Sequence, residues 1–379
     1  MLLLKIQSDC LTEKDDSRRL YKTLTTLLNS ASRSTVIGTL SLLAILDDGV
    51  KEKVNGGDNK VIYVFNSRNI QKSVQCILNV LVKGDHGLAR NCAVDLLIRL
   101  LDQAEFAHLL SLYRHLKPSL AEITSLMQHT KLSCESLAKI YELFLKFISL
   151  PALAETAYQV LLDDSAEQTS SPCCLETIIR HAQTSWPDRA MVGQHSLVLL
   201  QKLIQYLDKS SNSLLQHLPR DCLVEMLRTN LVRDASMDSQ NSDLQRIRCS
   251  QIGATLTVLA TLWSSRDDSV STLLHSVVDP QTCRHLWDTM LGLDCMSAFT
   301  RSGTLLRRHQ DALSSESLRC GCAWACLSLL LCLYSASRRD SAFESMFYQC
   351  LKVRDFNLTA FLNCEPVQTR SNHGTVLSI

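Results

Sequence analysis

The sequence predicts an all-α protein built from repeated pairs of short amphipathic helices. Apolar residues recur at spacings of three and four through most of the 379 residues, which is the period of one face of an α-helix. Glycine and proline are few, with 12 and 7 residues, and runs of β-branched residues bounded by turn residues are scarce. We therefore expect helices along nearly the whole chain.

The clearest pair of helices lies between residues 67 and 102. The apolar positions are Ile70, Val74, Ile77, Leu78, Leu81 and Val82 in residues 67–83, and Leu88, Val94, Leu97, Ile98 and Leu101 in residues 87–102. The polar turn Gly84-Asp85-His86 joins the two segments. Two short helices cannot bury such stripes against each other alone, so each pair must stack on similar neighbours.

Further helical patterns follow in order along the chain. They are expected at residues 17–30, 34–47, 104–115, 118–129, 133–148, 150–163, 173–184, 188–208, 219–232, 243–264, 281–291, 298–312, 315–336, 340–352 and 355–363. Ser133 and Ser315 stand where helix N-caps are needed. Successive pairs begin at an irregular period of roughly 30 to 50 residues, within the armadillo/HEAT range. The sequence thus predicts an armadillo/HEAT-like helical-repeat solenoid over residues 1–364, with a closed helical bundle as the alternative.

Four segments interrupt the pattern. Residues 55–64 carry Asn-Gly-Gly-Asp before a β-leaning run, which predicts an inserted surface loop. Residues 163–172 and 233–242 are polar and aperiodic, so we expect mobile loops there. Residues 365–379 lose all periodicity and are predicted to be a disordered tail. Neither end has the polar face that terminal repeats need, which is typical of a fragment or an incomplete gene model.

Charge and cysteine usage limit the classes of partner and compartment. Lys and Arg number 39 and Asp and Glu 38, a net charge of +1, so we expect no direct binding to nucleic acid. The basic cluster at residues 301–309 is interpreted as a solvated surface. The longest apolar run, residues 323–336, is shorter than the roughly 20 residues of a membrane span. Without an export signal, the 16 cysteines are expected to be reduced thiols in the cytoplasm, with the nucleus as an alternative.

No motif in the sequence predicts an enzyme or a cofactor. Gly-rich phosphate loops, dinucleotide fingerprints, nucleophile elbows and paired-His zinc helices are all missing. The densest set of potential metal ligands is Cys320, Cys322, Cys326 and Cys332. Because they lie among Ala, Trp and Leu on a predicted helix, packed thiols are the preferred interpretation, with a Cys-rich metal-binding helical protein as the rival.

Two other groups of residues are weaker candidates for a metal site or a catalytic site. Cys173 and Cys174, with His181, would project from different faces of a helix. His108 and His115 share a helix face, but no carboxylate or thiol stands at a spacing that would orient either one. We therefore predict neither a metal site nor a catalytic site from these residues.

Leu137, Ile140 and Glu142 spell L-x-x-I-x-E, which resembles the docking motif read by the B56 regulatory subunits of protein phosphatase 2A. Such motifs bind as extended peptides. Here the same residues belong to the helical stripe of residues 133–148, so binding would require that helix to leave the core.

One family resemblance covers most of the chain. Arg68-Asn69-Ile70 opens a helix, Asn79 to Asp85 closes it, and Val94-Asp95-Leu96-Leu97 lies in the next helix. These segments resemble the armadillo-type N-terminal region of the family of the cancerous inhibitor of protein phosphatase 2A. The likeness is strongest over residues 18–116 and returns in residues 345–362. Residues 55–64 look like an insertion relative to this family. We also expect the family's first repeats and its C-terminal coiled coil to be missing from the chain, so that functions that depend on those parts do not carry over.

The resemblance implies a non-enzymatic scaffold that associates with subunits of protein phosphatase 2A and restrains its action, with roles in mitosis and in the response to DNA breaks. It also implies a homodimer formed through the closing helices, within residues 315–364. The candidate interface residues are Phe343, Phe347, Leu351, Phe356 and Phe361. A simple cap of the last repeat is the alternative role for these residues, and an armadillo-fold adaptor of an unrelated complex is the alternative function.

Overall fold

The computed structural model of the protein describes residues 23–24, 26–28, 32, 34–40, 70–83, 87–103, 106–128, 132–162, 173–183, 189–210, 218–232, 242–265, 267–275, 277–292, 325 and 328–351. The regular structure of these residues is helical, with no strand among them. The predicted all-α class is therefore confirmed. Among the described helices, none has the length and hydropathy that crossing a bilayer requires.

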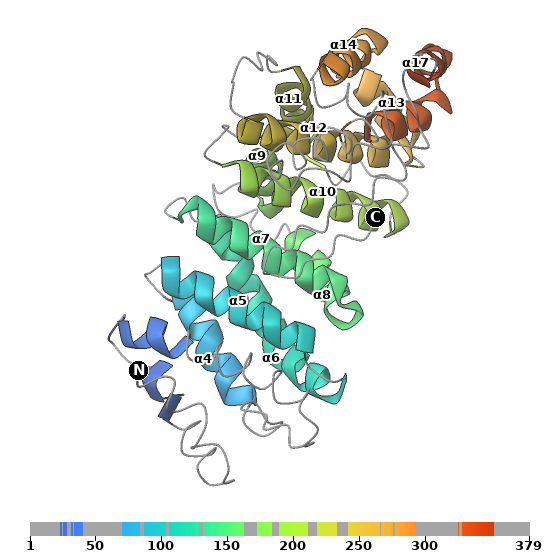
Figure 1. The fold of residues 1–379 in the computed structure, drawn as a ribbon. Coiled ribbons are helices and arrows are strands. Elements are labelled where there is room, and N and C mark those ends of the chain that lie inside the picture. Colours follow the sequence, from blue (N-terminus) through green and yellow to red (C-terminus); the bar gives the residue numbers. More distant parts are fainter. Residues whose placement is uncertain are drawn as a thin grey trace, which may run out of the picture. The chain divides into compact units, whose positions relative to one another are not determined.

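The chain divides into two compact units, Met1–Thr177 and Ile178–Ile379 (Figure 1). The first contains α4 (Ile70–Lys83), α5 (Gly87–Gln103), α6 (Phe106–Met127), α7 (Cys134–Ser149) and α8 (Pro151–Leu162). The second contains α10 (Ala190–Ser210), α11 (Arg220–Val232), α12 (Ser242–Trp263), α13 (Asp268–His275), α14 (Pro280–Gly292) and α17 (Ser341–Leu351). The division falls inside α9 (Cys174–Ala182). Residues 23–28 and 34–40 are helical where described, and residues 328–337 form a further helix before α17.

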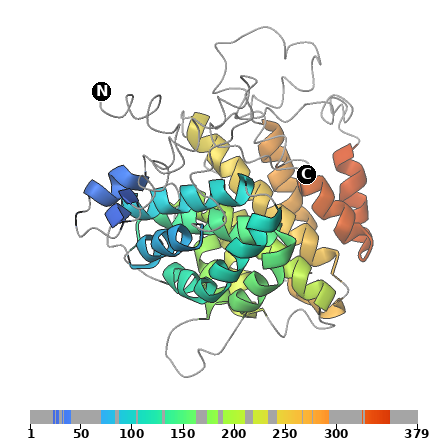
Figure 2. The same cartoon turned by 90° about the horizontal axis from the view of Figure 1, so that it is seen from below.

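In the first unit, helices that are two apart in the sequence pack side by side. One layer holds α4, α6 and α8, the other holds α5 and α7, and α4–α5, α6–α7 and α7–α8 pack between the layers. Figures 1 and 2 show these helices stacked against one another. The largest fully buried rings of this unit, Tyr141, Phe144 and Phe147, lie on α7. Two alternating layers are the arrangement of a helical-repeat solenoid, so the predicted architecture is confirmed.

Two ion pairs fix the register between α5 and α7. Lys139 Nζ lies 2.7 Å from Asp95 Oδ1, and Lys146 pairs with Asp102 one heptad further on. Both pairs join residues 44 apart, so the two helices run parallel. A repeat of this length lies within the range of about 40 to 47 residues that is typical of armadillo and HEAT repeats.

The second unit uses small hydroxyl side chains to set a parallel register. The hydroxyls of Thr257 and Ser328 lie 3.2 Å apart, and so do those of Ser264 and Ser335, both pairs being 71 residues apart in sequence. The helix of residues 328–337 therefore runs parallel to α12. In this unit α12 also packs on α10, α11 and α13, while α14 packs on α17.

Two helix assignments from the sequence need correction. The sequence predicts separate helices at residues 104–115 and 118–129, but α6 runs continuously through Pro118. Pro118 is exposed, and buried Leu116, Leu120 and Ile123 continue one apolar stripe on the other side. Proline removes one backbone hydrogen bond of the helix, and burial of the apolar stripe outweighs that loss.

The second correction concerns α13, which the periodicity did not predict. This helix has eight residues and follows a polar stretch, so its pattern is too short to recognise in the sequence. In the structure, Val270, Leu273 and Leu274 are buried at helical spacing. The hydroxyl of Ser265 accepts a hydrogen bond of 3.2 Å from the backbone N–H of Asp267, just before the helix.

Several predictions concern residues outside the described part of the chain. They include the inserted loop at 55–64, the loop at 163–172, most of the loop at 233–242, the basic cluster at 301–309 and the tail at 365–379. The single-domain boundary at residue 364 also stays a prediction.

Candidate docking surface

The inner face of α17 anchors this helix to the second unit. Phe343, Met346 and Cys350 are buried at spacings of three and four, which is one side of a helix. Asp340 caps the N-terminus, because its Oδ1 accepts a hydrogen bond of 2.8 Å from the backbone N–H of Ala342. The position of α17 is therefore defined by both packing and capping.

A cluster of three rings holds the start of α17. Phe343 lies with its ring centroid 5.5 Å from Trp263 of α12 and 5.8 Å from His275 of α13. Trp263 and His275 are 5.1 Å apart in an edge-to-face arrangement, and His275 Nδ1 lies 3.7 Å from Asp340 Oδ2. Phe343 is only 1% exposed. Phe343, one of the candidate interface residues, thus lies in the core and packs on the buried side of α17.

The outer side of α17 and the neighbouring helix form an exposed apolar surface, here called the aromatic face: Leu331, Tyr334, Phe347 and Tyr348. Leu331, Tyr334 and Tyr348 are 50%, 52% and 52% exposed. The Phe347 ring lies 5.9 Å from Tyr334 and 5.8 Å from Tyr348. Three of the six large apolar side chains that are exposed among the described residues lie here. Such a concentration is typical of a docking surface.

The predicted interface residues do not all lie on the same side of α17. Phe347 belongs to the aromatic face, whereas Phe343 does not. The side chain of Leu351, and all of Phe356 and Phe361, lie outside the described residues. Sequence reasoning missed Leu331 and Tyr334, because residues 323–336 are apolar on almost every side and the period cannot identify the outward face.

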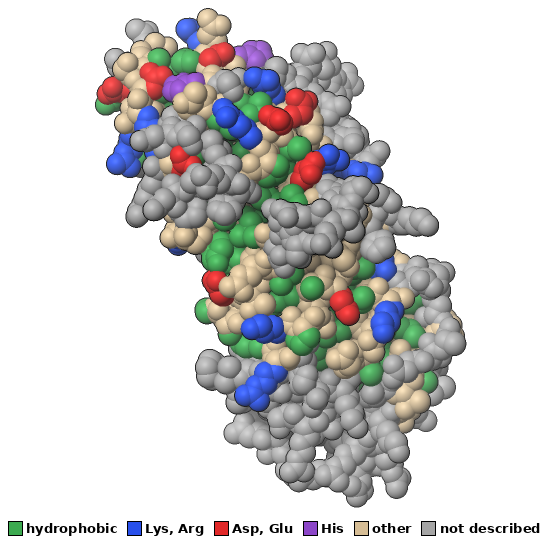
Figure 3. All heavy atoms as spheres, turned by 180° about the vertical axis from the view of Figure 1, so that it is seen from behind, with side chains coloured by type: hydrophobic (Ala, Val, Ile, Leu, Met, Phe, Trp, Pro, Cys, Tyr) green, Lys and Arg blue, Asp and Glu red, His purple; other side chains and the backbone are tan. Residues whose placement is uncertain are grey.

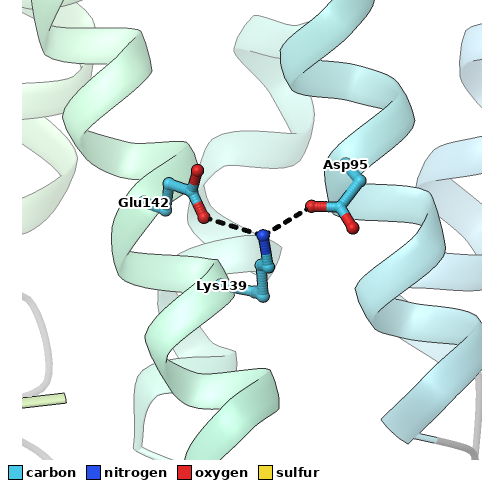
Figure 4. A network of polar contacts seen from close by, with 3 residues as sticks. All are labelled: Asp95, Lys139 and Glu142. Atoms are coloured by element: carbon cyan, nitrogen blue, oxygen red, sulfur yellow. Dashed lines mark hydrogen bonds and ion pairs between the residues drawn. The ribbon is translucent and has the colours of Figure 1, made fainter. Parts of the chain in front are cut away.

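In the first unit the most connected polar group is the network of Asp95, Lys139 and Glu142 (Figure 4). Lys139 Nζ lies 2.7 Å from Asp95 Oδ1 and 3.0 Å from Glu142 Oε2. Burial alone would lower the pKa of Lys139, but the hydrogen bonds and negative charges of its two partners outweigh burial and raise the pKa. Its cation is therefore kept charged between two carboxylates, which is a structural role.

The L-x-x-I-x-E motif lies in the folded α7. Leu137 and Ile140 are buried, and Glu142 is held by Lys139. An extended docking peptide must expose these side chains, so the motif is not presented while α7 is packed.

None of the ten described cysteines forms a disulfide, and six of them are buried. Burial raises the pKa of the Cys332 thiol to about 12 and that of Cys174, which also neighbours Cys173, to about 12. Burial, with the neighbouring Cys332 and Cys350, raises the pKa of Cys283 as well. These thiols stay protonated and pack as small apolar groups.

Within the described ranges, no three His, Cys, Asp or Glu side chains are arranged to hold a metal ion. The described residues therefore do not bring Cys173, Cys174 and His181 together as a ligand set. Cys320, Cys322 and Cys326 lie outside these ranges, as do the side chains of His108 and His115.

Charged side chains are mixed on the face drawn in Figure 3. Lys and Arg side chains lie beside Asp and Glu, and no extended area of one sign gathers among the residues coloured there. This distribution agrees with the net charge of +1. It supplies no electrostatic footprint for a nucleic acid on that face.

Comparison with solved structures finds a likeness to the crystal structure of an engineered protein from the Northeast Structural Genomics Consortium. The identity is 14%, the match covers 87% of each chain, and the TM-score is 0.21. A likeness at this level carries no argument about fold or function.

Comparison with protein families gives a match to the model described as CIP2A, N-terminal, over residues 4–364. The match spans the segments that carry the resemblance in the sequence, including Arg68-Asn69-Ile70 and Val94 to Leu97. It also includes α17 and the residues before it. Since the match covers nearly all of the 379 residues, the protein belongs to the CIP2A N-terminal family.

Proposed function

We propose that the protein is a non-catalytic scaffold that associates with protein phosphatase 2A and restrains its action, and that it forms a homodimer through α17 and the residues that follow. Membership of the CIP2A family, a family of non-catalytic regulators, supports the scaffold and its relation to the phosphatase. The aromatic face carries the dimer proposal, because it concentrates exposed apolar side chains on a helix that the core holds in place.

A homodimer formed through this face would be isologous, with the same surface on both subunits. Aromatic side chains at the centre of such an interface contribute most of its binding energy. In this proposal Phe347 contacts the partner directly, and Leu351, Phe356 and Phe361 extend the interface beyond the described residues. Phe343 contributes indirectly, since its contact with Trp263 fixes the orientation of α17.

The dimer is tested by light scattering on purified wild-type protein and Phe347→Glu. We expect a wild-type dimer at micromolar concentration and a monomeric Phe347→Glu, because a carboxylate would be buried without a partner. Leu88→Glu is the control, since Leu88 is an apolar side chain that is 55% exposed but lies on α5; we expect it to stay dimeric. A wild type that is monomeric at tens of micromolar, or a dimeric Phe347→Glu, would contradict the assigned interface.

The partner is tested by pull-down with purified scaffold, catalytic and B56 regulatory subunits of protein phosphatase 2A. We expect the folded chain to retain at least one subunit, and circular dichroism confirms that the bait is helical. Leu137→Ala within α7 serves as a second bait. The motif is buried in the folded α7 and cannot dock on a B56 subunit. The Leu137→Ala substitution should therefore weaken binding only to the extent that it unfolds α7. A folded bait that retains no subunit would favour an adaptor of an unrelated complex.

We place the proposed scaffold in the cytoplasm, with the nucleus as a second location and mitosis as the process it serves. Reduced, buried thiols such as Cys283 and Cys332 support a reducing compartment. Imaging of a fluorescent fusion through the cell cycle tests this placement, and a fusion confined to the secretory pathway would contradict it.

A further inference from the structure

The aromatic face belongs to two helices that fold back on each other. The helix of residues 328–337 is joined to α17 by the short turn at residues 338–340. Beyond this turn, the rings of Tyr334 and Phe347 meet again with their centroids 5.9 Å apart. Two helices that pack together after so short a connection form an antiparallel helical hairpin. The two helices and their turn are here called the closing hairpin.

The outward side chains of the closing hairpin are ordered by their distance from the turn. Arg338 and Glu344 lie nearest the turn, Tyr334, Phe347 and Tyr348 follow, and Leu331 is farthest. Arg338 comes four residues after Tyr334, and Glu344 four residues before Tyr348. Residues four apart share a helix face, so the two charged side chains border the aromatic face at its turn end.

Four charged side chains lie at this end, and two of them are engaged within the chain. Arg339 donates from its guanidinium to the carbonyl of Ser265, and Asp340 caps the N-terminus of α17. Arg338 and Glu344 are both exposed, and neither side chain forms an ion pair or a hydrogen bond with a described residue. The aromatic face is therefore bordered by one outward cation and one outward anion.

We propose that in the homodimer Arg338 of each subunit pairs with Glu344 of the partner subunit, which places the two turns at the same end of the interface. This inference rests on the proposed homodimer and adds its orientation. An isologous interface makes every contact twice, so the dimer contains two such pairs beside its aromatic core.

The opposite orientation would bring the turn of one hairpin to the far end of the other. Arg338 and Glu344 would then face Leu331, and a charge buried against an apolar side chain loses hydration without gaining a partner. With the turns together, each charge meets its opposite and the rings meet rings. The two hairpins then form four helices whose neighbours are antiparallel, as in bundles with short loops.

The test measures the dissociation constant of the dimer by light scattering across a dilution series. Arg338→Glu and Glu344→Arg should each raise it at least about tenfold, because each substitution brings like charges together twice in one dimer. Lys209→Glu is the matched control, since it reverses an exposed cation in the last turn of α10. It should leave the dissociation constant unchanged, and circular dichroism confirms that all variants are helical.

Two combinations assign the effect to a contact between subunits. A chain with both Arg338→Glu and Glu344→Arg should return to within about threefold of the wild-type dissociation constant. Mixing the two single variants should give heterodimers that are tighter than either homodimer, because both contacts then join opposite charges. A pair formed within one chain would also be restored by the double substitution, but it would not favour the mixture.

Unchanged dissociation constants in both single variants, or a mixture no tighter than the homodimers, would overturn the pairing, while Phe347→Glu still decides the homodimer. Lys352 follows α17 in the sequence, at the end away from the turn. A dimer weakened by Lys352→Glu and not by Arg338→Glu would indicate the opposite orientation. A wild type that is monomeric at tens of micromolar would reject the interface and, with it, the pairing.

Discussion

At the scale of single residues, burial determines the protonation of the groups that resemble ligands or nucleophiles. Burial, together with the smaller effect of the Arg189 cation, lowers the pKa of His181 to about 4. Burial raises the pKa of Cys174 to about 12. A neutral imidazole and a protonated thiol at neutral pH pack as uncharged groups. Neither residue therefore supplies a charge or a nucleophile to the surface.

His181 gives the protein a specific sensitivity to acid. Its folded pKa of about 4 lies below the ordinary value of 6.5, so between these values the unfolded chain binds more protons than the folded one. The contribution of neutral His181 to the free energy of unfolding is thus fully present above pH 6.5 and is lost as the pH falls towards 4. Urea unfolding at pH 7 and pH 5 should show a larger loss of unfolding free energy in wild type than in His181→Gln.

The matched control for this measurement is His285→Gln on α14, since His285 is exposed. This variant should show the wild-type loss between the two pH values. Equal losses in wild type and His181→Gln would mean that burial of His181 does not contribute to acid sensitivity.

At the scale of elements, buried polar side chains complete helix ends from a neighbouring helix. Arg90 of α5 donates from Nε to the carbonyl of Leu81 in the last turn of α4, at 3.0 Å. Asn230 of α11 donates to the carbonyl of Ala182, the last residue of α9, at 3.0 Å. The terminal carbonyls of a helix have no partner within it. These contacts therefore join neighbouring helices to one another as well as satisfying their ends.

The ion pairs between α5 and α7 should show a measurable coupling. In a double-mutant cycle with Asp95→Asn and Lys139→Met, we expect about 0.5–1 kcal/mol at low salt and less at high salt, because both side chains are partly exposed. The pKa of Lys139 is raised above 10.5, so this stability is present below pH 10.5 and is lost as pH rises through the folded value. Urea unfolding measures both effects.

Lys202→Met on α10 serves as the control, since Lys202 is exposed and forms no ion pair with a described residue. It should change the unfolding free energy by less than about 0.5 kcal/mol. A coupling energy of zero between Asp95 and Lys139 would show that the pair sets register without stabilising the fold.

At the scale of the whole molecule, stability is expected to be local. Each helix of the first unit packs on helices one or two positions away in the sequence, and repeat proteins with such contacts gain stability from their nearest neighbours. A core change should therefore act on its own unit first. The two compact units offer a direct comparison.

Leu97→Ala in α5 removes a fully buried side chain and should cost about 2–5 kcal/mol. Hydrogen exchange should lose protection in α4, α5 and α7 while α12 keeps it. Leu203 in α10 is another fully buried leucine, and α10 packs on α12. Leu203→Ala should therefore lower the protection of α10 and α12, while α4, α5 and α7 keep theirs. Equal losses in both units after either change would indicate that the chain unfolds as one cooperative body.

The docking surface shows how far the sequence alone could be taken. Apolar residues occupy most sides of α17, so the family resemblance could only name Phe343 and Phe347 together as candidate interface residues. Only the contact of Phe343 with Trp263 and His275 assigns the first to the core, and the rings of Tyr334 and Tyr348 surround the second. Trp263 lies 80 positions before Phe343, and helical periodicity carries no information about such distant partners.

The all-α class, the repeated helices and the family follow from the amino-acid sequence, because the helical period is a local property and the stripes at residues 67–102 are long enough to show it. Three features follow from the packing instead: α6 continues through Pro118, Lys139 joins α5 to α7, and one particular side of α17 faces outward. Each of these depends on burial against helices far away in the chain, where the free energy of packing exceeds the local preference of any one residue.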